Sequence, residues 1–226
     1  MRTAVRLLLA TVLGTAGLVG PPLTTAASAR TDDWHGSRHA MPGKYAWLDD
    51  ITPSDTYTIV VVRGMGRAAV VRHLGGVKRK LAAMTPTEAE TYLFDHVTAD
   101  YSWPRVVQVQ RRGHAVVVYA PYGVLDDAAL ARLSRHGRAA EFFTDVELDT
   151  SVTVAKKGEV VRQFDAGFKP PKEGALRAER GLDWGAPDQN VWATAWAFDE
   201  RISRTHISRT WFDQAHPTFI AKKGAL

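Results

Sequence analysis

The hydrophobic positions from residue 45 onwards follow two spacings, one typical of strands and one typical of helices. Residues 57–62 and 114–120 are apolar on both faces, which predicts central strands that are covered on each side. Residues 106–111 alternate between apolar and polar positions, so we expect Gln108 and Gln110 to face water. Three shorter strands are predicted at residues 139–143, 151–155 and 159–164.

The clearest local signal in the chain is the start of a helix at Thr85-Pro86-Thr87-Glu88. A threonine N-cap, a proline in the first turn and a glutamate three residues after the cap predict a helix from Pro86 to about Thr98. Further helices are predicted at residues 66–74, from Asp126 or Asp127 to Gly137, from Asn190 onwards and near Trp211. The helix after Asn190 is apolar over more than one stripe, so we expect it to be enclosed.

The turns between these elements favour an antiparallel sheet. Lys157-Gly158 and Arg112-Gly113 are short enough to join neighbouring strands as hairpins. We expect a solvated loop at Lys78–Lys80 and a long loop at Gly167–Gln189, which is long enough to cover a site or to move. The prediction is a single α+β domain over residues 45–220, with a mostly antiparallel central sheet and helices packed against it.

The first 29 residues have the order of a secretory signal peptide. Arg2 and Arg6 precede an apolar run from Leu7 to Val19, and the small residues Ala27-Ser28-Ala29 follow. The run is shorter than the roughly 20 apolar residues that a membrane span needs. We therefore expect a signal peptide at residues 1–29, a flexible lead-in at 30–44, and a secreted, extracellular protein with no membrane span after cleavage.

Composition narrows the chemistry further. The chain has no cysteine, which excludes disulfides, thiol nucleophiles and thiolate metal sites. The net charge is +5, and removal of the predicted leader takes away Arg2 and Arg6 and lowers it to +3. This charge is spread along the chain, so nucleic acid is not an expected partner. Abundant alanine, arginine, valine and glycine beside a single asparagine indicate a GC-rich genome.

Short motifs over most of the predicted mature chain resemble an uncharacterised actinobacterial domain-of-unknown-function family, numbered 6461. The matching segments are Tyr45–Leu48, Tyr57–Gly64, Val70–Gly75, Leu133–Arg135, Gly158–Asp165 and Ala195–Trp211. The resemblance implies a shared fold in an exported variant. It implies no activity, because the family has none established.

One segment departs from the family pattern. In the family, the second strand of the central hairpin begins with tryptophan and ends with glutamate before an Asn-Gly-like turn. Here those two places hold His114 and Tyr119, and Pro121-Tyr122-Gly123 follows. If that glutamate has a chemical role in relatives, this chain lacks it.

Motifs for cofactors and metals are incomplete. Gly64-x-Gly66 lacks the third glycine of a dinucleotide-binding fingerprint, and the chain has no His-Glu-x-x-His motif. Asp32, Asp33, His35 and His39 gather in the predicted lead-in, where no folded scaffold would hold them as metal ligands. We therefore expect neither a metal nor a cofactor.

Two histidines stand near carboxylates in the C-terminal part. His206 follows Asp199 and Glu200, and His216 follows Asp213, so each could combine a base with the acid that orients it. Neither is accompanied by a Gly-x-Ser-x-Gly or Ser-x-x-Lys motif. An exported hydrolase that uses a histidine and a carboxylate is therefore the alternative function, and no catalytic residue is assigned.

The preferred hypothesis is a non-catalytic binding domain. The chain holds seven tryptophans, and aromatic side chains are enriched in recognition sites as well as in cores. Trp103 and Trp184 lie in loops beside proline or glycine, and Tyr119 and Tyr122 lie at the end of the central hairpin. These four are the candidate binding residues for an unknown protein or small molecule outside the cytoplasm, with the loop at Gly167–Gln189 bordering the site.

Overall fold

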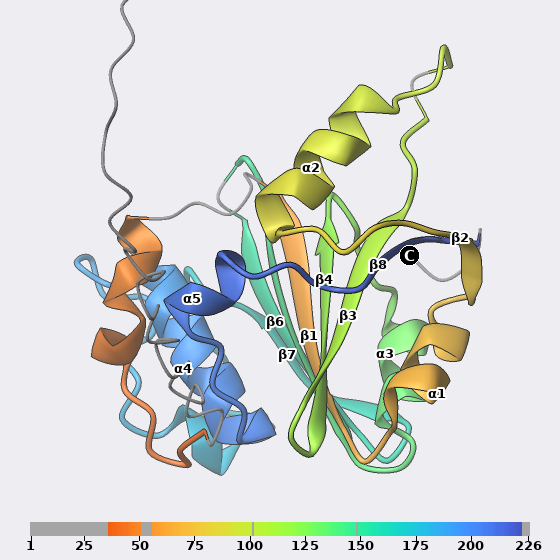
Figure 1. Ribbon diagram of the computed structural model, residues 1–226. Coiled ribbons are helices and arrows are strands. Elements are labelled where there is room, and N and C mark those ends of the chain that lie inside the picture. Colours follow the sequence, from red (N-terminus) through yellow and green to blue (C-terminus); the bar gives the residue numbers. More distant parts are fainter. Residues whose placement is uncertain (1–35, 51–55, 101, 148, 223–226) are drawn as a thin grey trace, which may run out of the picture. The chain divides into compact units, whose positions relative to one another are not determined.

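In the part of the chain that the structure describes, eight strands form one antiparallel sheet (Figure 1). The structure is a computed structural model that describes residues 36–50, 56–100, 102–147 and 149–222. The strands are β1 (Tyr57–Arg63), β2 (Val77–Lys80), β3 (Val106–Arg112), β4 (Ala115–Pro121), β5 (Arg138–Thr144), β6 (Thr150–Lys156), β7 (Glu159–Asp165) and β8 (Thr218–Ala221). Their spatial order is β2-β8-β3-β4-β1-β5-β6-β7. The predicted signal peptide and residues 30–35 of the lead-in, with Asp32, Asp33 and His35, lie outside the described residues.

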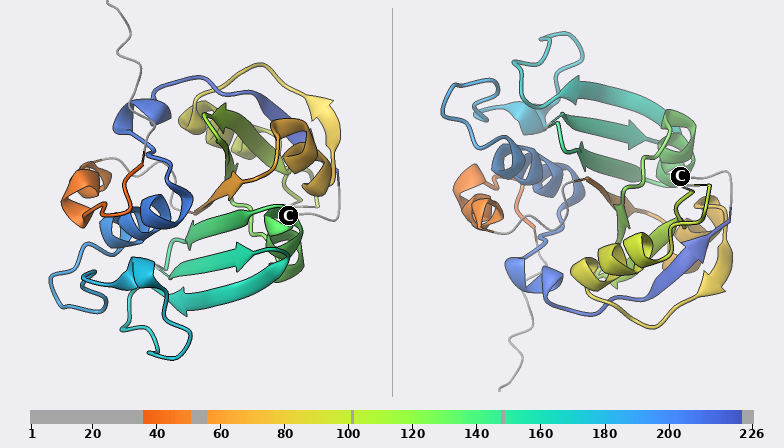
Figure 2. Two further views of the ribbon diagram at one scale, coloured as in Figure 1. Left: turned by 90° about the horizontal axis from the view of Figure 1, so that it is seen from below. Right: turned by 90° about the horizontal axis from the view of Figure 1, so that it is seen from above.

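Helices cover both faces of this sheet. They are η1 (Pro42–Asp49), α1 (Arg67–His73), α2 (Pro86–Asp95), α3 (Asp127–Ser134), η2 (Arg177–Glu179), α4 (Val191–Ser203) and α5 (Arg209–Phe212), where η marks a 3-10 helix. In Figures 1 and 2, α4, α5 and η1 lie on one side of the sheet, and α1 and α3 lie on the other. We call these sides the α4 face and the α3 face. None of the helices in the described ranges combines the length and the apolar character needed to cross a membrane.

The predicted α+β class with a mostly antiparallel central sheet is confirmed. β1 lies between β4 and β5, and its residues Tyr57 to Val62 are all buried, as the apolar pattern predicted. Ile59 and Val61 belong to the core on the α4 face, whereas Val60 and Val62 belong to the core on the α3 face. A strand with β-branched residues on both sides is stable only under two helical layers.

The helix starts also agree with the sequence. Thr85 caps α2 in a reciprocal capping box with Glu88, and the Asp126 side chain accepts a bond from the backbone N–H of Ala129 at the start of α3. Asn190 caps α4 in the same way, and α4 is buried from Ala193 to its last residue. Enclosure on all sides confirms what the broad apolar surface of this segment predicted.

Two strands at one sheet edge were not predicted. Residues 77–80, expected as a solvated loop, form the edge strand β2, which pairs with β8. Three of the four residues in β2 are the exposed cations Lys78, Arg79 and Lys80. Short, positively charged edge strands discourage pairing with further chains, so the charge that suggested a loop is compatible with an edge strand.

The polar side of β3 is covered, contrary to the expectation that Gln108 and Gln110 face water. Gln108 is 1% exposed, and its Nε2 donates to the carbonyl oxygen of Met84 at 2.7 Å. Gln110 accepts a bond from the indole N–H of Trp211 at 2.7 Å. Alternation correctly separated the two faces of the strand, but it could not reveal that the chain before α2 and the short helix α5 cover the polar face.

A buried ion pair fixes the long loop that follows β7. The guanidinium of Arg162 forms two parallel bonds to the Glu179 carboxylate, at 2.9 and 2.8 Å, and the exposed fractions of the two residues are 6% and 8%. Arg162 also donates to the carbonyl oxygens of Glu173 and Pro171. The loop at Gly167–Gln189 is therefore held onto the outer strand of the sheet.

We predict that Arg162→Met lowers the free energy of unfolding by about 3–5 kcal/mol, because Glu179 would remain buried without its partner. Urea denaturation followed by circular dichroism measures this change. The control is Arg209→Met, which removes a pair with Asp50 at 3.9 Å between side chains that are 54% and 71% exposed. Its expected effect is below about 0.5 kcal/mol. Equal losses in both variants would contradict the structural role of the Arg162 pair.

Candidate functional site

A groove of about 810 Å³ is lined by four parts of the described chain. These parts are the N-terminal segment 38–41, strands β5 to β7, loop residues 176–181 and the end of α4. Its apolar lining residues are Met41, Val154, Val161, Leu176, Ala178 and Ile202. Sites for small organic molecules have volumes of about 300–1,000 Å³ and mostly apolar walls, so the groove has the size and part of the character of such a site.

Cations make up much of the rest of the lining, and none of the described residues that line the groove is acidic. The cationic residues are Arg138 and Lys156 of the sheet, Arg177 and Arg180 of the loop, Arg38 of the N-terminal segment, and Arg201 and Arg204 near the end of α4. Charges of one sign around a partly enclosed hollow reinforce one another and attract ions of the opposite sign. The groove is therefore suited to an anion.

The sheet places three cations side by side at the same end. Arg63 of β1 lies opposite Arg138 of β5, and Arg138 lies opposite Lys156 of β6. This close approach depends on two glycines, because a Cβ at Gly64 would lie 2.2 Å from the carbonyl oxygen of His136, and one at Gly137 would lie 2.2 Å from that of Arg63. Gly64, one of the two glycines of the incomplete nucleotide-loop motif, therefore helps the row of cations to form together with Gly137.

The row faces the C-terminal end of α4. Arg63 donates to the carbonyl oxygen of Ser203 at 3.1 Å, and Arg138 donates to that of Ile202 at 3.1 Å. The last carbonyl groups of a helix carry partial negative charge, so these bonds stabilise both the helix end and the two arginines.

Arg201 joins two walls of the groove. It is 8% exposed, its Nε donates to the carbonyl oxygen of Ala40, and its Nη1 donates to those of Ala178 and Arg180. The N-terminal segment and the loop thus meet at one guanidinium. Burial lowers the pKa of Arg201. The preceding residue, Glu200, binds the N-terminal segment at Ser37 and Lys44.

Glu200 receives four hydrogen-bonding groups. Its side chain is fully buried, and it accepts bonds from the backbone N–H of Ser37 at 2.6 Å, the Lys44 ammonium at 2.9 Å and the Tyr45 hydroxyl at 2.6 Å. His206 Nδ1 lies 3.1 Å from the same carboxylate. Burial raises the pKa of Glu200, but the bonds from His206, Tyr45, Ser37 and Lys44 outweigh it and lower the pKa to about 2.

These contacts involve the described part of the segment that was expected to be a flexible lead-in up to residue 44. Residues 36–44 are attached to α4 and its C-terminal end, where the backbone N–H of Gly36 also donates to the carbonyl oxygen of Arg204 at 3.2 Å. The polar composition of the segment suggested solvation. Its partners are a carboxylate and a guanidinium more than 150 residues away in sequence, which no local pattern reveals.

Burial makes two other carboxyl groups harder to ionise. Burial raises the pKa of Asp199 well above its ordinary value, and the charge of Glu141 adds to the effect. Burial likewise raises the pKa of Glu141 to about 8, although a bond from the backbone of Leu125 opposes the shift. Glu141 is therefore mainly neutral at pH 7, and the Asp199 carboxyl group loses its proton less readily than an exposed aspartate.

The histidine–carboxylate pairs proposed from the sequence have different outcomes. His206 does meet Glu200, with Tyr45 beside both, as described above. His216 is fully buried, and its Nε2 donates to the carbonyl oxygen of Trp211 at 2.8 Å rather than to Asp213. Burial lowers the pKa of His216 to about 4, so its ring is neutral at pH 7. Within the described ranges, no three histidine, aspartate or glutamate side chains group as metal ligands.

The four candidate binding residues lie away from the groove lining. Trp103 is 40% exposed and packs against Tyr122, with ring centres 4.7 Å apart, and Phe94 joins them. Tyr119 is fully buried in the core on the α4 face, so its ring serves packing there. Trp184 is half-buried against Phe164 at the far end of the long loop.

Part of the long loop predicted at Gly167–Gln189 lines the groove. The cations were missed because they come from separate segments and never form a run. One signal was present in the sequence. Arg63, Arg138 and Lys156 each stand within two residues of a turn glycine, and an antiparallel meander brings such turns to one end of the sheet.

We predict that Glu200→Gln lowers the free energy of unfolding at pH 7 by about 2–3 kcal/mol, because the donors around residue 200 lose a charged acceptor. The folded pKa of Glu200 is depressed, so its stabilisation is present above the ordinary value of 4.5 and is lost as pH falls towards 2. Urea denaturation between pH 7 and pH 2.5 should show the difference from the wild type shrinking over that window. The exposed Glu173→Gln is the control, and a difference that does not vary with pH would contradict this assignment.

Comparisons with known proteins do not assign the chain to a family. No family model matches the sequence, no curated protein matches it, and no solved structure matches it. The function therefore has to be inferred from the residues of the chain itself.

Proposed function

We propose that this protein is a secreted, non-catalytic binding domain whose groove takes a small organic anion. The observation that carries the proposal is the lining of the groove, in which cations surround apolar residues and none of the described lining residues is acidic. Secretion is supported by the order of charge, apolar run and small residues at the N-terminus. The partner was expected to be a protein or a small molecule, and the groove favours the second.

The mixture of lining residues narrows the ligand class. Val154, Ile202 and Leu176 provide apolar surface that would be covered by the body of the ligand. Exposed cations such as Lys156 and Arg177 stand on the same groove and would attract an acidic group. A small molecule with an apolar body and at least one negative charge satisfies both features, whereas a fully hydrated inorganic ion satisfies only the second.

Nucleic acid remains an unexpected partner. Surfaces for single-stranded nucleic acid combine a basic track with exposed aromatic side chains on which bases stack. The described lining of this groove has no aromatic ring other than that of His39. The exposed aromatic residues Phe94 and Trp103 lie elsewhere, beside Tyr122. The separation of charge from aromatic surface favours a small ligand.

The test uses octyl sulfate as the probe, because it has an apolar chain and a single negative charge. We predict that it binds the mature protein and that the double variant Lys156→Gln/Arg177→Gln raises its Kd at least about fivefold by removing two exposed groove cations. Isothermal titration calorimetry measures the Kd. Absence of binding to the wild-type protein would overturn the proposal.

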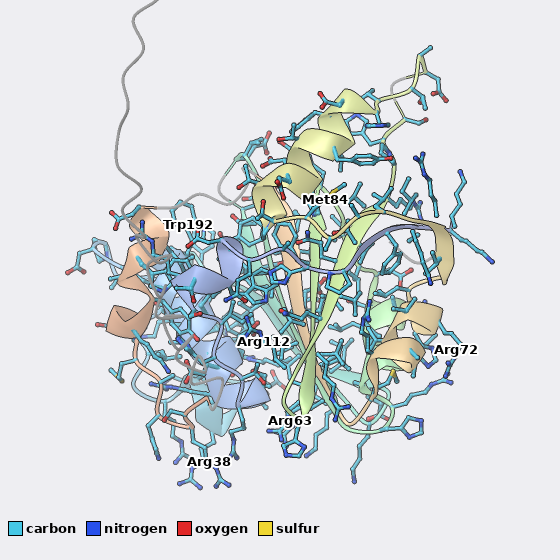
Figure 3. All side chains as sticks on the ribbon, viewed as in Figure 1. Arg38, Arg63, Arg72, Met84, Arg112 and Trp192 are labelled. Atoms are coloured by element: carbon cyan, nitrogen blue, oxygen red, sulfur yellow. The ribbon has the colours of Figure 1, made fainter. Side chains whose placement is uncertain are left out.

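The matched control is Arg72→Gln/Lys78→Gln. It removes the same amount of charge from exposed residues of α1 and β2, away from the groove, and Figure 3 labels Arg72 on that side. Its Kd for octyl sulfate should change less than about twofold. An equal effect of both double variants would show attraction to net charge rather than binding in the groove.

The alternative, an exported hydrolase, has one observation in its favour. His206 Nδ1 lies 3.1 Å from Glu200, as a base with an orienting carboxylate requires. However, that carboxylate also holds Ser37, Lys44 and Tyr45, which indicates a structural tie. An assay with ester, peptide and glycoside substrates distinguishes the two functions. Turnover by the wild-type protein that is lost in His206→Ala would show that the protein is a hydrolase rather than a binding domain.

A further inference from the structure

Three arginines of the groove lining, Arg38, Arg138 and Arg204, gather with Arg63 near the end of α4. Figure 3 shows Arg38 and Arg63 at the lower end of the molecule, and α4 ends in the same region in Figure 1. Arg63 and Arg138 reach consecutive carbonyl oxygens at that helix end, and Arg204 is the next residue after the helix. The charges of Arg38, Arg138 and Arg63 all act on Arg204. We call these four residues the arginine cluster.

The fold brings these like charges together although they repel one another. Arg63 and Arg138 are directly opposite in the sheet, a position in which like charges destabilise the pairing of strands. None of the four forms an ion pair with a carboxylate in the described ranges. Bonds to the Ser203 and Ile202 carbonyl groups satisfy one N–H of Arg63 and one of Arg138, and each guanidinium has five N–H donors.

Arg204 adds a second, independent observation. Its backbone has a φ of 56°, in the left-handed region that residues other than glycine and asparagine rarely adopt. Its Nε is buried and has no hydrogen-bond partner among the described residues. Burial first, and then the three neighbouring arginines, lower the pKa of Arg204. The left-handed φ belongs to the C-cap of α4, and the buried donor without a partner among like charges is the feature that an anionic ligand would satisfy.

We infer that the arginine cluster binds the phosphate group of a phosphate monoester, whose organic part lies along the apolar residues of the groove. This inference rests on the proposed function, because it names the acidic group of the same ligand. Arg38 and Arg204 reach the group from the N-terminal segment and the end of α4, and Arg138 reaches it from the sheet. Val154 and Ile202, which share the groove lining with them, contact the organic part.

The charge and shape of the cluster favour phosphate over other acidic groups. A phosphate monoester carries a charge of roughly −1.5 to −2 at pH 7 and presents three acceptor oxygens. Several guanidinium groups can each donate two parallel bonds to such oxygens. A carboxylate or a sulfate ester carries a single charge, so it neutralises less of the cluster.

The experiment compares octyl phosphate with octyl sulfate, which differ in charge and share the apolar chain. We expect octyl phosphate to bind at least about tenfold more tightly near pH 7.5, and the preference to fall to less than about twofold near pH 5, where the phosphate has gained a proton. His39 lines the groove for both ligands alike, so the ratio of the two Kd values is the readout. Equal Kd values near pH 7.5 would overturn the inference while leaving the proposed function standing.

The variant Arg38→Gln locates the site. Arg38 is exposed, so its replacement should not disturb folding, which thermal unfolding checks. We expect the preference for octyl phosphate near pH 7.5 to fall at least about threefold in Arg38→Gln and to stay unchanged in Arg72→Gln. Arg63→Lys, which keeps the charge but removes the fork of donors, should also reduce the preference. An unchanged preference in Arg38→Gln and Arg63→Lys would overturn the placement of the phosphate at this cluster.

A final arm identifies the source of the phosphate. Phosphatidylcholine vesicles with and without phosphatidic acid are sedimented with the wild-type protein in the presence and absence of octyl phosphate. Binding of free octyl phosphate without co-sedimentation supports a soluble ester, and co-sedimentation that octyl phosphate competes away supports the same group on a lipid. If neither octyl phosphate nor octyl sulfate binds, the proposed function fails together with the inference.

Discussion

Two consecutive charged residues inside α4, Glu200 and Arg201, hold the walls of the groove together. About 100° separates neighbouring side chains on a helix, so the two point in different directions. Glu200 binds Ser37, Lys44 and Tyr45, and Arg201 binds the backbone at residues 40, 178 and 180. Buried charges are tolerated only with such partners. The N-terminal segment and the long loop therefore take up their positions because these two groups require them.

The charge of the Arg162–Glu179 pair is balanced, whereas the charge of the arginine cluster is not. Arg162 and Glu179 form a buried pair in which each neutralises the other, and this pair serves stability. The arginine cluster has no such acid in the described ranges, and desolvation raises the pKa values of the buried Asp199 and Glu141. Positive charge that the fold maintains without compensation is the physical basis for expecting an anionic ligand.

The four candidate aromatic residues are not among the residues that line the groove. Tyr119 and Trp184 pack against other rings, which is the commonest use of large aromatic side chains. Trp103 and Tyr122 do come together, with Phe94, on an exposed surface near the end of α2. The groove, in contrast to that exposed aromatic surface, combines a measured volume, an apolar lining and positive charge.

The sequence by itself determined the element types, because alternation, capping residues and turn glycines act over a few neighbouring positions. β1, the capping box of α2 and the enclosed helix α4 were all predictable for this reason. Only the tertiary structure decided that β2 and β8 pair at an edge, that Gln108 is covered, and that cations from separate segments share one groove. Those outcomes depend on contacts between distant segments, and a contact of this kind leaves no periodic pattern in the chain.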